Sequence, residues 1–282
     1  MKNVLLSLGH GYSAQALAQR LLPQGWTVLG TTRDASKAER LRSAGVVPVD
    51  WTPQAVEDAL AQATHLLVSA GPDAVGDPAL RLAPQAIARR ASSLAWVGYL
   101  STTGVYGDQA GGWVDETTPP DPSTRRGQMR VAAEAAWQAI PDLPLHIFRL
   151  AGIYGPGRGP FEKLRRGTAR RIIKPGQVFS RIHVEDIAQT LDASIRQPNP
   201  GAIYNLCDDD PAPPQEVIEF AAALLGVPLP EEEAFDTAEL TPMARSFYAE
   251  SKRVSNRRIK EELGVQLIYP DYSAGLRALQ GA

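Results

Sequence analysis

The chain has 282 residues, of which 44% are hydrophobic and 21% are charged, and its formal net charge is −2. This composition is typical of a globular protein with a sizeable core, and the scattered lysines and arginines form no basic stripe that would indicate nucleic-acid binding. No apolar run approaches the roughly 20 residues that span a bilayer, so we expect a cytoplasmic protein with a small-molecule substrate and neither a membrane nor a nucleic acid as partner.

The cysteine and histidine content gives no sign of a disulfide or a metal site. Cys207 is the single cysteine, which excludes an internal disulfide and a multi-thiolate metal site. We expect it to be a small buried residue near a strand end. Each of the 4 histidines lacks a second histidine or a carboxylate at ligand spacing, so no metal is predicted.

The first 150 residues alternate short apolar runs with segments of helical period, which is the pattern of parallel strands joined by crossover helices. The predicted strands are residues 3–8, 26–30, 46–49, 65–69, 94–101 and 145–150. Between the first two runs an apolar stripe recurs at helical spacing until Pro23 and Gly25 end the helix. The stripe consists of Ala14, Leu17, Ala18, Leu21 and Leu22.

Six such strands with right-handed crossovers predict an α/β fold, a Rossmann-type doubly wound parallel sheet of strand order 3-2-1-4-5-6. Ligands of these sheets bind at the carboxyl ends of the strands, beside the point where the order reverses. After residue 150 the pattern loosens, and helices are predicted only at residues 184–195 and 214–225. We therefore expect an NAD(P)-binding domain at residues 1–150 and a smaller, irregular substrate-side lobe at residues 151–282.

The segment between the first strand and the first helix carries a G-x-G-x-x-A pattern, formed by Gly9, His10, Gly11, Tyr12, Ser13 and Ala14. Gly9 permits the tight turn, Gly11 lets backbone approach a pyrophosphate, and the small Ala14 keeps helix and strand close. The free N–H groups of the helix would then face the phosphates. Residues 9–13 are the predicted core of a dinucleotide site.

The second strand leads into Thr32 and Arg33, where an NAD-selective site usually carries an acidic residue. A guanidinium there suits the 2′-phosphate of NADP(H), so NADP is the predicted cofactor, with NAD kept open. The alternative is an exposed arginine in an ordinary loop. Further predicted cofactor contacts follow the third and fourth strands: Asp50, Ser69, Ala70 and Gly71.

Beyond the glycine-rich loop, four segments occur in a recognisable order: LSTTGVYG at residues 100–107, FRLAGIYGPG at 148–157, RIHVEDIA at 181–188 and YNL at 204–206. In these segments the chain resembles, over nearly its whole length, the extended short-chain dehydrogenase/reductase family in its NAD-dependent epimerase/dehydratase branch. The resemblance implies oxidoreductase or epimerase chemistry with a nicotinamide cofactor. It also implies a possible homodimer through the helices at residues 79–92 and 124–138.

The resemblance assigns catalytic roles with one departure. It places Thr102, with Thr103 beside it, where the family's Ser/Thr hydrogen-bonds the reacting oxygen. The family's Tyr and Lys, in a Y-x-x-x-K pattern, correspond here to Arg126 and Arg130 when the segment is aligned on Glu134. Arg130 keeps the positive charge and the expected contact with the nicotinamide ribose, whereas Arg126 stays protonated and is a poor acid–base catalyst.

Other residues are candidates for the lost proton donor and for substrate binding. Tyr106 can act as the acid or base, or can simply pack in its Val-Tyr-Gly turn. His183 lies in a segment that the family places beside the substrate, against the alternative of a capping histidine. Arg158 and Arg181 can engage an anionic substrate, against the alternative of solvated loop charges.

Two functions remain open from the sequence. The first is an NADP(H)-dependent oxidoreductase or epimerase acting on a small or nucleotide-linked substrate, favoured by Thr102 and the glycine-rich segment near residue 157. The second is a non-catalytic NADP(H)-binding redox sensor or regulatory protein, favoured by the missing Tyr and Lys.

Overall fold

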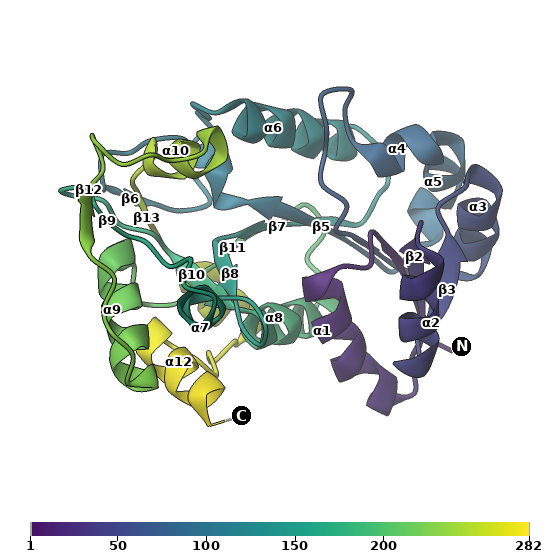
Figure 1. Cartoon of the computed structure of the whole chain (residues 1–282). Helices are drawn as coiled ribbons and strands as arrows, with labels where there is room; N and C mark the ends of the chain where they lie inside the picture. The colour runs from purple at the N-terminus through teal and green to yellow at the C-terminus, as the bar shows by residue number, and fades with distance from the viewer. Residues whose placement is uncertain (1, 282) are drawn as a thin grey trace.

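The computed structural model describes residues 2–281 and contains a seven-stranded parallel sheet flanked by helices (Figure 1). The strands are β1 (Val4–Leu8), β2 (Thr27–Thr32), β3 (Val47–Asp50), β4 (His65–Val68), β5 (Trp96–Thr102), β7 (Leu145–Leu150) and β11 (Ile203–Leu206). Their spatial order is β11-β7-β5-β4-β1-β2-β3. The predicted doubly wound Rossmann-type sheet and the order of its six strands are therefore confirmed, and β11 adds a seventh strand that the periodicity did not predict.

Helices cover both faces of the sheet. One face carries α1 (Tyr12–Leu21), α2 (Ala35–Ser43), α8 (Val184–Arg196) and α11 (Arg257–Leu263). The other carries α3 (Pro53–Gln62), α4 (Pro78–Leu82), α5 (Pro84–Arg90) and α6 (Arg125–Gln138). Each set buries its own apolar cluster against the sheet, and this burial supplies most of the drive for folding (Figure 1).

The first helix follows its predicted stripe, because Ala14, Leu17 and Leu21 are all buried against the sheet. Leu22 instead begins a 3₁₀ segment, Leu22–Gln24, which Gly25 ends in the left-handed region at φ +81°. The helix expected at residues 79–92 is divided into α4 and α5. Pro84 explains the division, since proline has no N–H and disfavours helical backbone at the residue before it, here Ala83.

The remaining segments form a lobe beyond the carboxyl ends of the strands. Its helices are α7 (Pro160–Arg165), α9 (Pro214–Leu225), α10 (Pro242–Tyr248) and α12 (Tyr272–Gln280). Its strands form three parallel pairs: β8 (Gly152–Tyr154) with β10 (Arg181–His183), β9 (Arg171–Ile173) with β12 (Glu232–Ala234), and β6 (Trp113–Val114) with β13 (Arg253–Val254).

The chain crosses between the sheet and this lobe more than once. β6 precedes residue 150 yet pairs with β13, while α8 and β11 follow it yet belong to the sheet layer. The division at residue 150 stays a prediction. Cys207, directly after β11, is buried as expected and its thiol donates to the carbonyl of Val254 at 3.0 Å.

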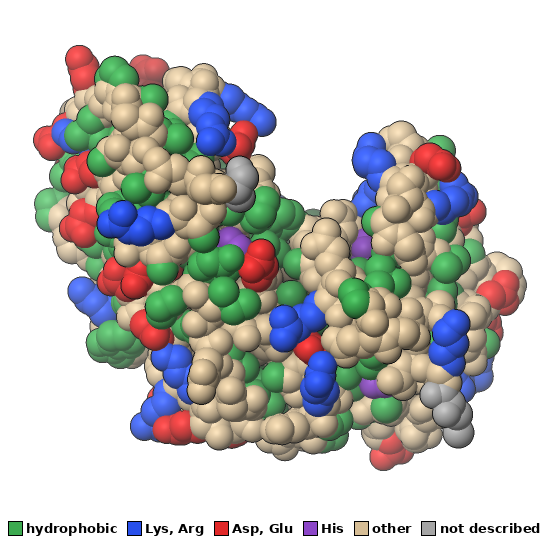
Figure 2. Space-filling model, turned by 90° about the horizontal axis from the view of Figure 1, so that it is seen from below, with side chains coloured by type: hydrophobic (Ala, Val, Ile, Leu, Met, Phe, Trp, Pro, Cys, Tyr) green, Lys and Arg blue, Asp and Glu red, His purple; other side chains and the backbone are tan. Residues whose placement is uncertain are grey.

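No helix within residues 2–281 is both long and apolar enough to cross a membrane. Seen from below, the molecule is hollowed between the C-terminal lobe and the N-terminal half (Figure 2). This hollow lies at the carboxyl ends of the strands, where ligands of doubly wound sheets bind.

Candidate cofactor and substrate site

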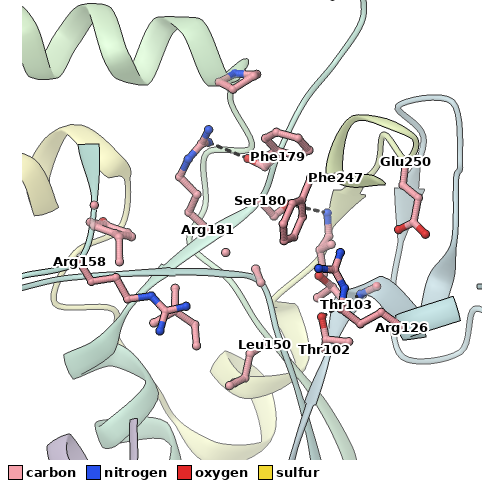
Figure 3. Close-up of a pocket in the computed structure, with 18 of the residues that line it drawn as sticks. Thr102, Thr103, Arg126, Leu150, Arg158, Phe179, Ser180, Arg181, Phe247 and Glu250 are labelled. Atoms are coloured by element: carbon pink, nitrogen blue, oxygen red, sulfur yellow. Dashed lines mark hydrogen bonds between the residues drawn. The ribbon is translucent and has the colours of Figure 1, made fainter. Parts of the chain in front are cut away.

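A cavity of about 900 Å³ joins the sheet to the lobe. Its walls come from the glycine-rich loop, the ends of β4, β5 and β7, the first turns of α6, and the lobe segments around residues 151–181 and 244–254. Figure 3 shows Thr102 and Thr103 facing the same space as Arg126, Arg158 and Arg181. The cavity thus brings together residues that are distant in the sequence.

The glycine-rich loop has the geometry of a phosphate cradle. Gly9 has φ +82°, and a Cβ there would lie 2.6 Å from the backbone nitrogen of Ala70, so the position requires glycine. Gly11 caps α1 without a side-chain hydrogen bond, and a Cβ there would meet nothing nearer than the Gly9 carbonyl at 3.6 Å. Gly11, Tyr12 and Ser13 line the cavity. The first N–H groups of α1 are therefore available to an anion.

His10 contributes backbone rather than side chain to this loop. Its ring is buried and packs against β2, since a Cβ on Gly30 would lie 2.8 Å from His10 Cγ. Burial, with nearby Lys37, lowers the pKa of His10 to about 4, so the ring is neutral at pH 7. The imidazole does not line the cavity.

The loop after β4 closes on the glycine-rich loop. The Ser69 hydroxyl donates to the Gly9 carbonyl, and Ser69 lines the cavity. A Cβ on Gly71 would lie 3.5 Å from Nη2 of Arg130, which places this loop beside α6. Ser69, Ala70 and Gly71 thus lie between the glycine-rich loop and Arg130.

Thr32, Arg33 and Asp50 lie at the carboxyl ends of β2 and β3, outside the walls of the main cavity. The Thr32 hydroxyl accepts from the Asp34 N–H at 3.1 Å. Arg33 is exposed, and within residues 2–281 its guanidinium makes no hydrogen bond or ion pair. Lys37, which the sequence analysis did not single out, lies in the first turn of α2, and burial lowers its pKa.

Thr102 and Thr103 stand at the end of β5. The Thr102 hydroxyl accepts from the Gly104 N–H at 3.2 Å and caps the 3₁₀ segment Thr103–Tyr106. Both threonines line the cavity, which is what hydrogen bonding to a reacting oxygen requires.

Arg130 is fixed at the cavity wall. Its Nη1 donates to the Leu100 carbonyl at 2.7 Å and to the Tyr99 hydroxyl at 3.1 Å. One turn further along α6, Glu134 pairs with Arg149 at 2.8 Å, and both side chains are at most 5% exposed. The Glu134 carboxylate also accepts from the Ser101 hydroxyl, so α6 is tied to β5 and β7 directly beneath Arg130.

Arg126, at the expected tyrosine position, also lines the cavity but is engaged by the lobe. Its guanidinium carbon lies 4.2 Å from the ring centroid of Phe247 in α10. A guanidinium stays protonated near neutral pH, and this one stacks on an aromatic face. Arg126 therefore offers charge and shape to a ligand rather than a transferable proton.

The structure does not bring Tyr106 to the cavity. The side chain is fully buried, its hydroxyl donates to Asn205 Oδ1 at 2.7 Å, and the Arg149 guanidinium lies 4.9 Å from its ring. Burial raises its pKa. Tyr106 is therefore not positioned to replace the missing acid, because its side chain turns into the core at the 3₁₀ segment.

His183 is also outside the cavity, and its capping interpretation holds. Its Nδ1 accepts from the Glu185 N–H at 3.3 Å at the start of α8. The ring is 1% exposed and packs between Tyr154 and Tyr269, and burial lowers its pKa. A substrate contact through this imidazole is therefore not supported.

The two arginines assigned to substrate both reach the cavity but differ in their surroundings. Arg181 is held by the carbonyls of Phe179 at 2.8 Å and Ala212 at 3.1 Å. Arg158 is exposed, with its guanidinium carbon 5.5 Å from the ring centroid of Tyr12.

The cavity residues that the sequence analysis did not single out include a pair that only the fold brings to the wall. Glu250 and Lys252 form an ion pair of 2.8 Å, and Glu250 also accepts from the Ser123 hydroxyl at 2.8 Å. They reach the wall because β13 pairs with β6, a contact between strands of 2 residues each. No sequence pattern marks so short a pairing.

Positive charge dominates the cavity wall. Seven cationic side chains line it against a single carboxylate, Glu250, among the described residues. The cations are Arg126, Arg130, Arg158, Lys163, Arg170, Arg181 and Lys252. A concave surface with this imbalance concentrates anionic ligands. Within residues 2–281 no group of three or more His, Cys, Asp or Glu residues is arranged to hold a metal ion.

Comparisons with known proteins agree with this architecture. A model of the NAD dependent epimerase/dehydratase family matches residues 6–207. Protein YeeZ of Escherichia coli K12 is 31% identical, covering 96% of this chain and 97% of that protein. A 3-diazoavenalumate denitrifying reductase of a Streptomyces species is 26% identical over 97% of this chain and 98% of its own length.

Among solved structures, a functionally unknown conserved protein from Silicibacter pomeroyi DSS is 61% identical, with a TM-score of 0.96 and 99% of each chain covered. The matched family region includes the glycine-rich loop, the threonines after β5, α6 and β11. This chain therefore belongs to the NAD dependent epimerase/dehydratase family.

Proposed function

We propose that this chain is an NADP(H)-dependent oxidoreductase whose substrate is a small or nucleotide-linked molecule carrying negative charge. The observation that carries the proposal is the single cavity in which the glycine-rich loop, Thr102 and Arg130 face a lobe rich in arginine and lysine. A dinucleotide, the reacting group of a substrate and an anionic substituent of that substrate can all occupy this one cavity.

The residues fit the family's cofactor. The position of Gly9 against Ala70 and the open side of Gly11 form the cradle that a pyrophosphate needs beside α1. Arg33 would hold the 2′-phosphate, because its guanidinium has no protein partner within residues 2–281, and Arg130 would hold the nicotinamide ribose. When bound, the nicotinamide supplies or accepts a hydride.

The chain's own groups would orient the substrate more than they move protons. The hydroxyls of Thr102 and Thr103 donate to the reacting oxygen, and Arg181 attracts an anionic substituent from the opposite wall. Neither threonine is an acid near neutral pH, and Arg126 does not release its proton. The proton for a developing alkoxide would therefore come from water or from the substrate, which predicts slow turnover of ordinary carbonyl substrates.

The reductase from Streptomyces, 26% identical over nearly the full length, supports an oxidoreductase over an epimerase. A non-catalytic redox sensor is the second candidate, supported by Arg126 at the tyrosine position and its stacking on Phe247. Both candidates share the cofactor, so only turnover separates them.

The test is stopped-flow loss of NADPH absorbance with a panel of carbonyl substrates, each in a neutral and a carboxylate- or phosphate-bearing form. We expect turnover above the cofactor-only blank for anionic members, and a loss of about a hundredfold in Thr102→Val. The double variant Arg126→Tyr with Arg130→Lys should raise the rate, because a general acid contributes about 10²- to 10⁴-fold. Tight cofactor binding without substrate-dependent turnover across the panel would favour the sensor.

A further inference from the structure

The geometry points to Arg158 as a cofactor-binding residue, a clamp that the C-terminal lobe places on the pyrophosphate of the bound dinucleotide. This inference builds on the proposed function and revises the substrate role that the sequence favoured for the same residue. It concerns how the lobe takes part in cofactor binding, which the glycine-rich loop alone would otherwise perform.

The loop that carries Arg158 lies directly on the glycine-rich loop. The Tyr12 hydroxyl donates to the Pro156 carbonyl at 2.9 Å, and a Cβ on Gly155 would lie 2.6 Å from that hydroxyl. The guanidinium of Arg158 lies over the ring of Tyr12, which is the first residue of α1. Two independent contacts therefore hold Arg158 next to the N-terminus of the helix that faces the phosphates.

The guanidinium is directed into the shared cavity and is free to bind. Figure 3 shows Arg158 extending into the pocket from the side opposite Thr102. Gly11, Tyr12 and Arg158 line the same cavity, and the Arg158 guanidinium makes no hydrogen bond or ion pair in the described part of the chain. Arg181, by contrast, already donates to two backbone carbonyls.

Charge accounting supports the same position. Residues 9–14 hold no lysine or arginine, and His10 is neutral because burial lowers its pKa to about 4. The helix N-terminus alone supplies about half a positive charge, against the two negative charges of a pyrophosphate. A guanidinium beside it provides most of the missing charge as a planar pair of N–H donors, which suits phosphate oxygens.

Because Arg158 comes from the lobe, it would contact the phosphate on the nicotinamide side, which is the side that faces the substrate. The adenosine phosphate would then depend mainly on the glycine-rich loop. Two ligands can therefore isolate the contribution of Arg158, because ADP-ribose contains the whole pyrophosphate, whereas AMP contains only the adenosine phosphate.

The experiment is isothermal titration of the full chain and of Arg158→Gln with NADPH, ADP-ribose and AMP. We expect NADPH and ADP-ribose to bind about tenfold or more weakly to Arg158→Gln, with AMP changed less than about threefold, and Arg158→Lys to recover part of the loss. Arg166→Gln is the matched control, since Arg166 is an exposed arginine of the same lobe outside the cavity wall.

Unchanged affinity for ADP-ribose in Arg158→Gln would overturn the inference and return Arg158 to the substrate. An equal loss for AMP, or the same loss in Arg166→Gln, would also overturn it, because the effect would then be one of general charge. If the parent protein bound none of the three ligands, the proposed function would fail together with the clamp. Parent binding with an unaffected variant would refute the clamp alone.

Discussion

The central sheet and the C-terminal lobe differ in how much of their surface they bury. Every residue of β4 and β7 is buried, and the sheet is continuous from β11 to β3. The strands of the lobe are two or three residues long, and its helix α10 buries none of its residues, with Met243 67% and Phe247 51% exposed. The sheet is held by two large apolar clusters, whereas the lobe has a smaller apolar cluster among α7, α9 and α12 together with polar contacts.

The two regions contribute different kinds of group to ligand binding. On the sheet side the pyrophosphate contacts predicted for the glycine-rich loop are backbone N–H groups and glycines, which depend on the fold and tolerate few changes. On the lobe side the cavity wall is made of side chains such as Arg181, Lys163 and Phe247. Substitutions in the lobe can therefore alter ligand preference while the sheet stays intact.

The ion pair of Glu134 and Arg149 should show the largest effect on the sheet side. Glu134→Ala leaves the Arg149 guanidinium buried without its partner, so we expect the free energy of unfolding in urea to fall by about 3–5 kcal/mol. The matched change Glu39→Ala removes an exposed pair with Arg42 and should alter stability by less than about 1 kcal/mol. Similar losses in both variants would show that burial does not set the contribution of the Glu134–Arg149 pair.

Asp208 provides a pH test at the base of the lobe. Its carboxylate is 1% exposed, and burial raises its pKa to about 8 from the ordinary value of 3.8, with the charge of Arg181 opposing the shift. A raised folded-state pKa means that the folded protein holds a proton that the unfolded chain releases. The contribution of protonated Asp208 to the free energy of unfolding is fully present below about pH 4 and is lost as pH rises towards 8.

Urea unfolding at a series of pH values, with Asp208→Asn as reference, measures this dependence. As pH rises from 5 to 8, the free energy of unfolding of the parent should fall relative to that of Asp208→Asn by at most about 1.4 kcal/mol per pH unit. Parallel curves for the two proteins would show that Asp208 is ionised in the folded state throughout this range.

Gly11→Val should separate binding from folding in the glycine-rich loop. The open side of Gly11 meets no protein atom closer than 3.6 Å, so the variant should fold normally while its side chain occupies the pyrophosphate position. We expect NADPH affinity to fall by about a hundredfold or more in calorimetric titration, with little change in urea midpoint. Gly9→Val should instead destabilise the fold, because φ +82° and the Ala70 backbone exclude a side chain.

Arg33→Ala should have a smaller effect, confined to cofactor choice. If the guanidinium binds the 2′-phosphate, the preference for NADPH over NADH should fall about tenfold or more, because a charged hydrogen bond contributes about 1.5–3 kcal/mol. Competitive titration with the two cofactors measures the preference, and Arg42→Ala, on the exposed surface of α2, is the control. Equal affinities in the parent protein would remove the basis for NADP selectivity.

Much of the sheet could be predicted, because buried parallel strands and amphipathic helices impose their periods on the sequence. β7 was predicted with its observed limits at residues 145–150, and α9 at residues 214–225. β11 was missed because its short apolar run is interrupted by the polar Asn205, whose side chain accepts from Tyr106 inside the core. Pro84 in the sequence marks the break between α4 and α5, although the predicted helix at residues 79–92 ran through it.

The candidate site was only partly predictable. The glycine-rich loop, Thr102 and Arg130 are local features whose position follows from the strand and helix that carry them. The sequence does not reveal that the Tyr106 side chain turns into the core. Nor does it reveal that the His183 side chain caps a helix.

The sequence by itself determined six strands of the central sheet, the conformation required at Gly9 and the absence of the family's Tyr and Lys, because each depends on neighbouring residues. The tertiary structure decided which side chains share a cavity. Glu250 and Lys252 reach the wall through the short pairing of β13 with β6, and Arg158 meets Tyr12 across 146 positions of the sequence. Contacts between such distant segments depend on how the whole chain packs, and no local pattern encodes them.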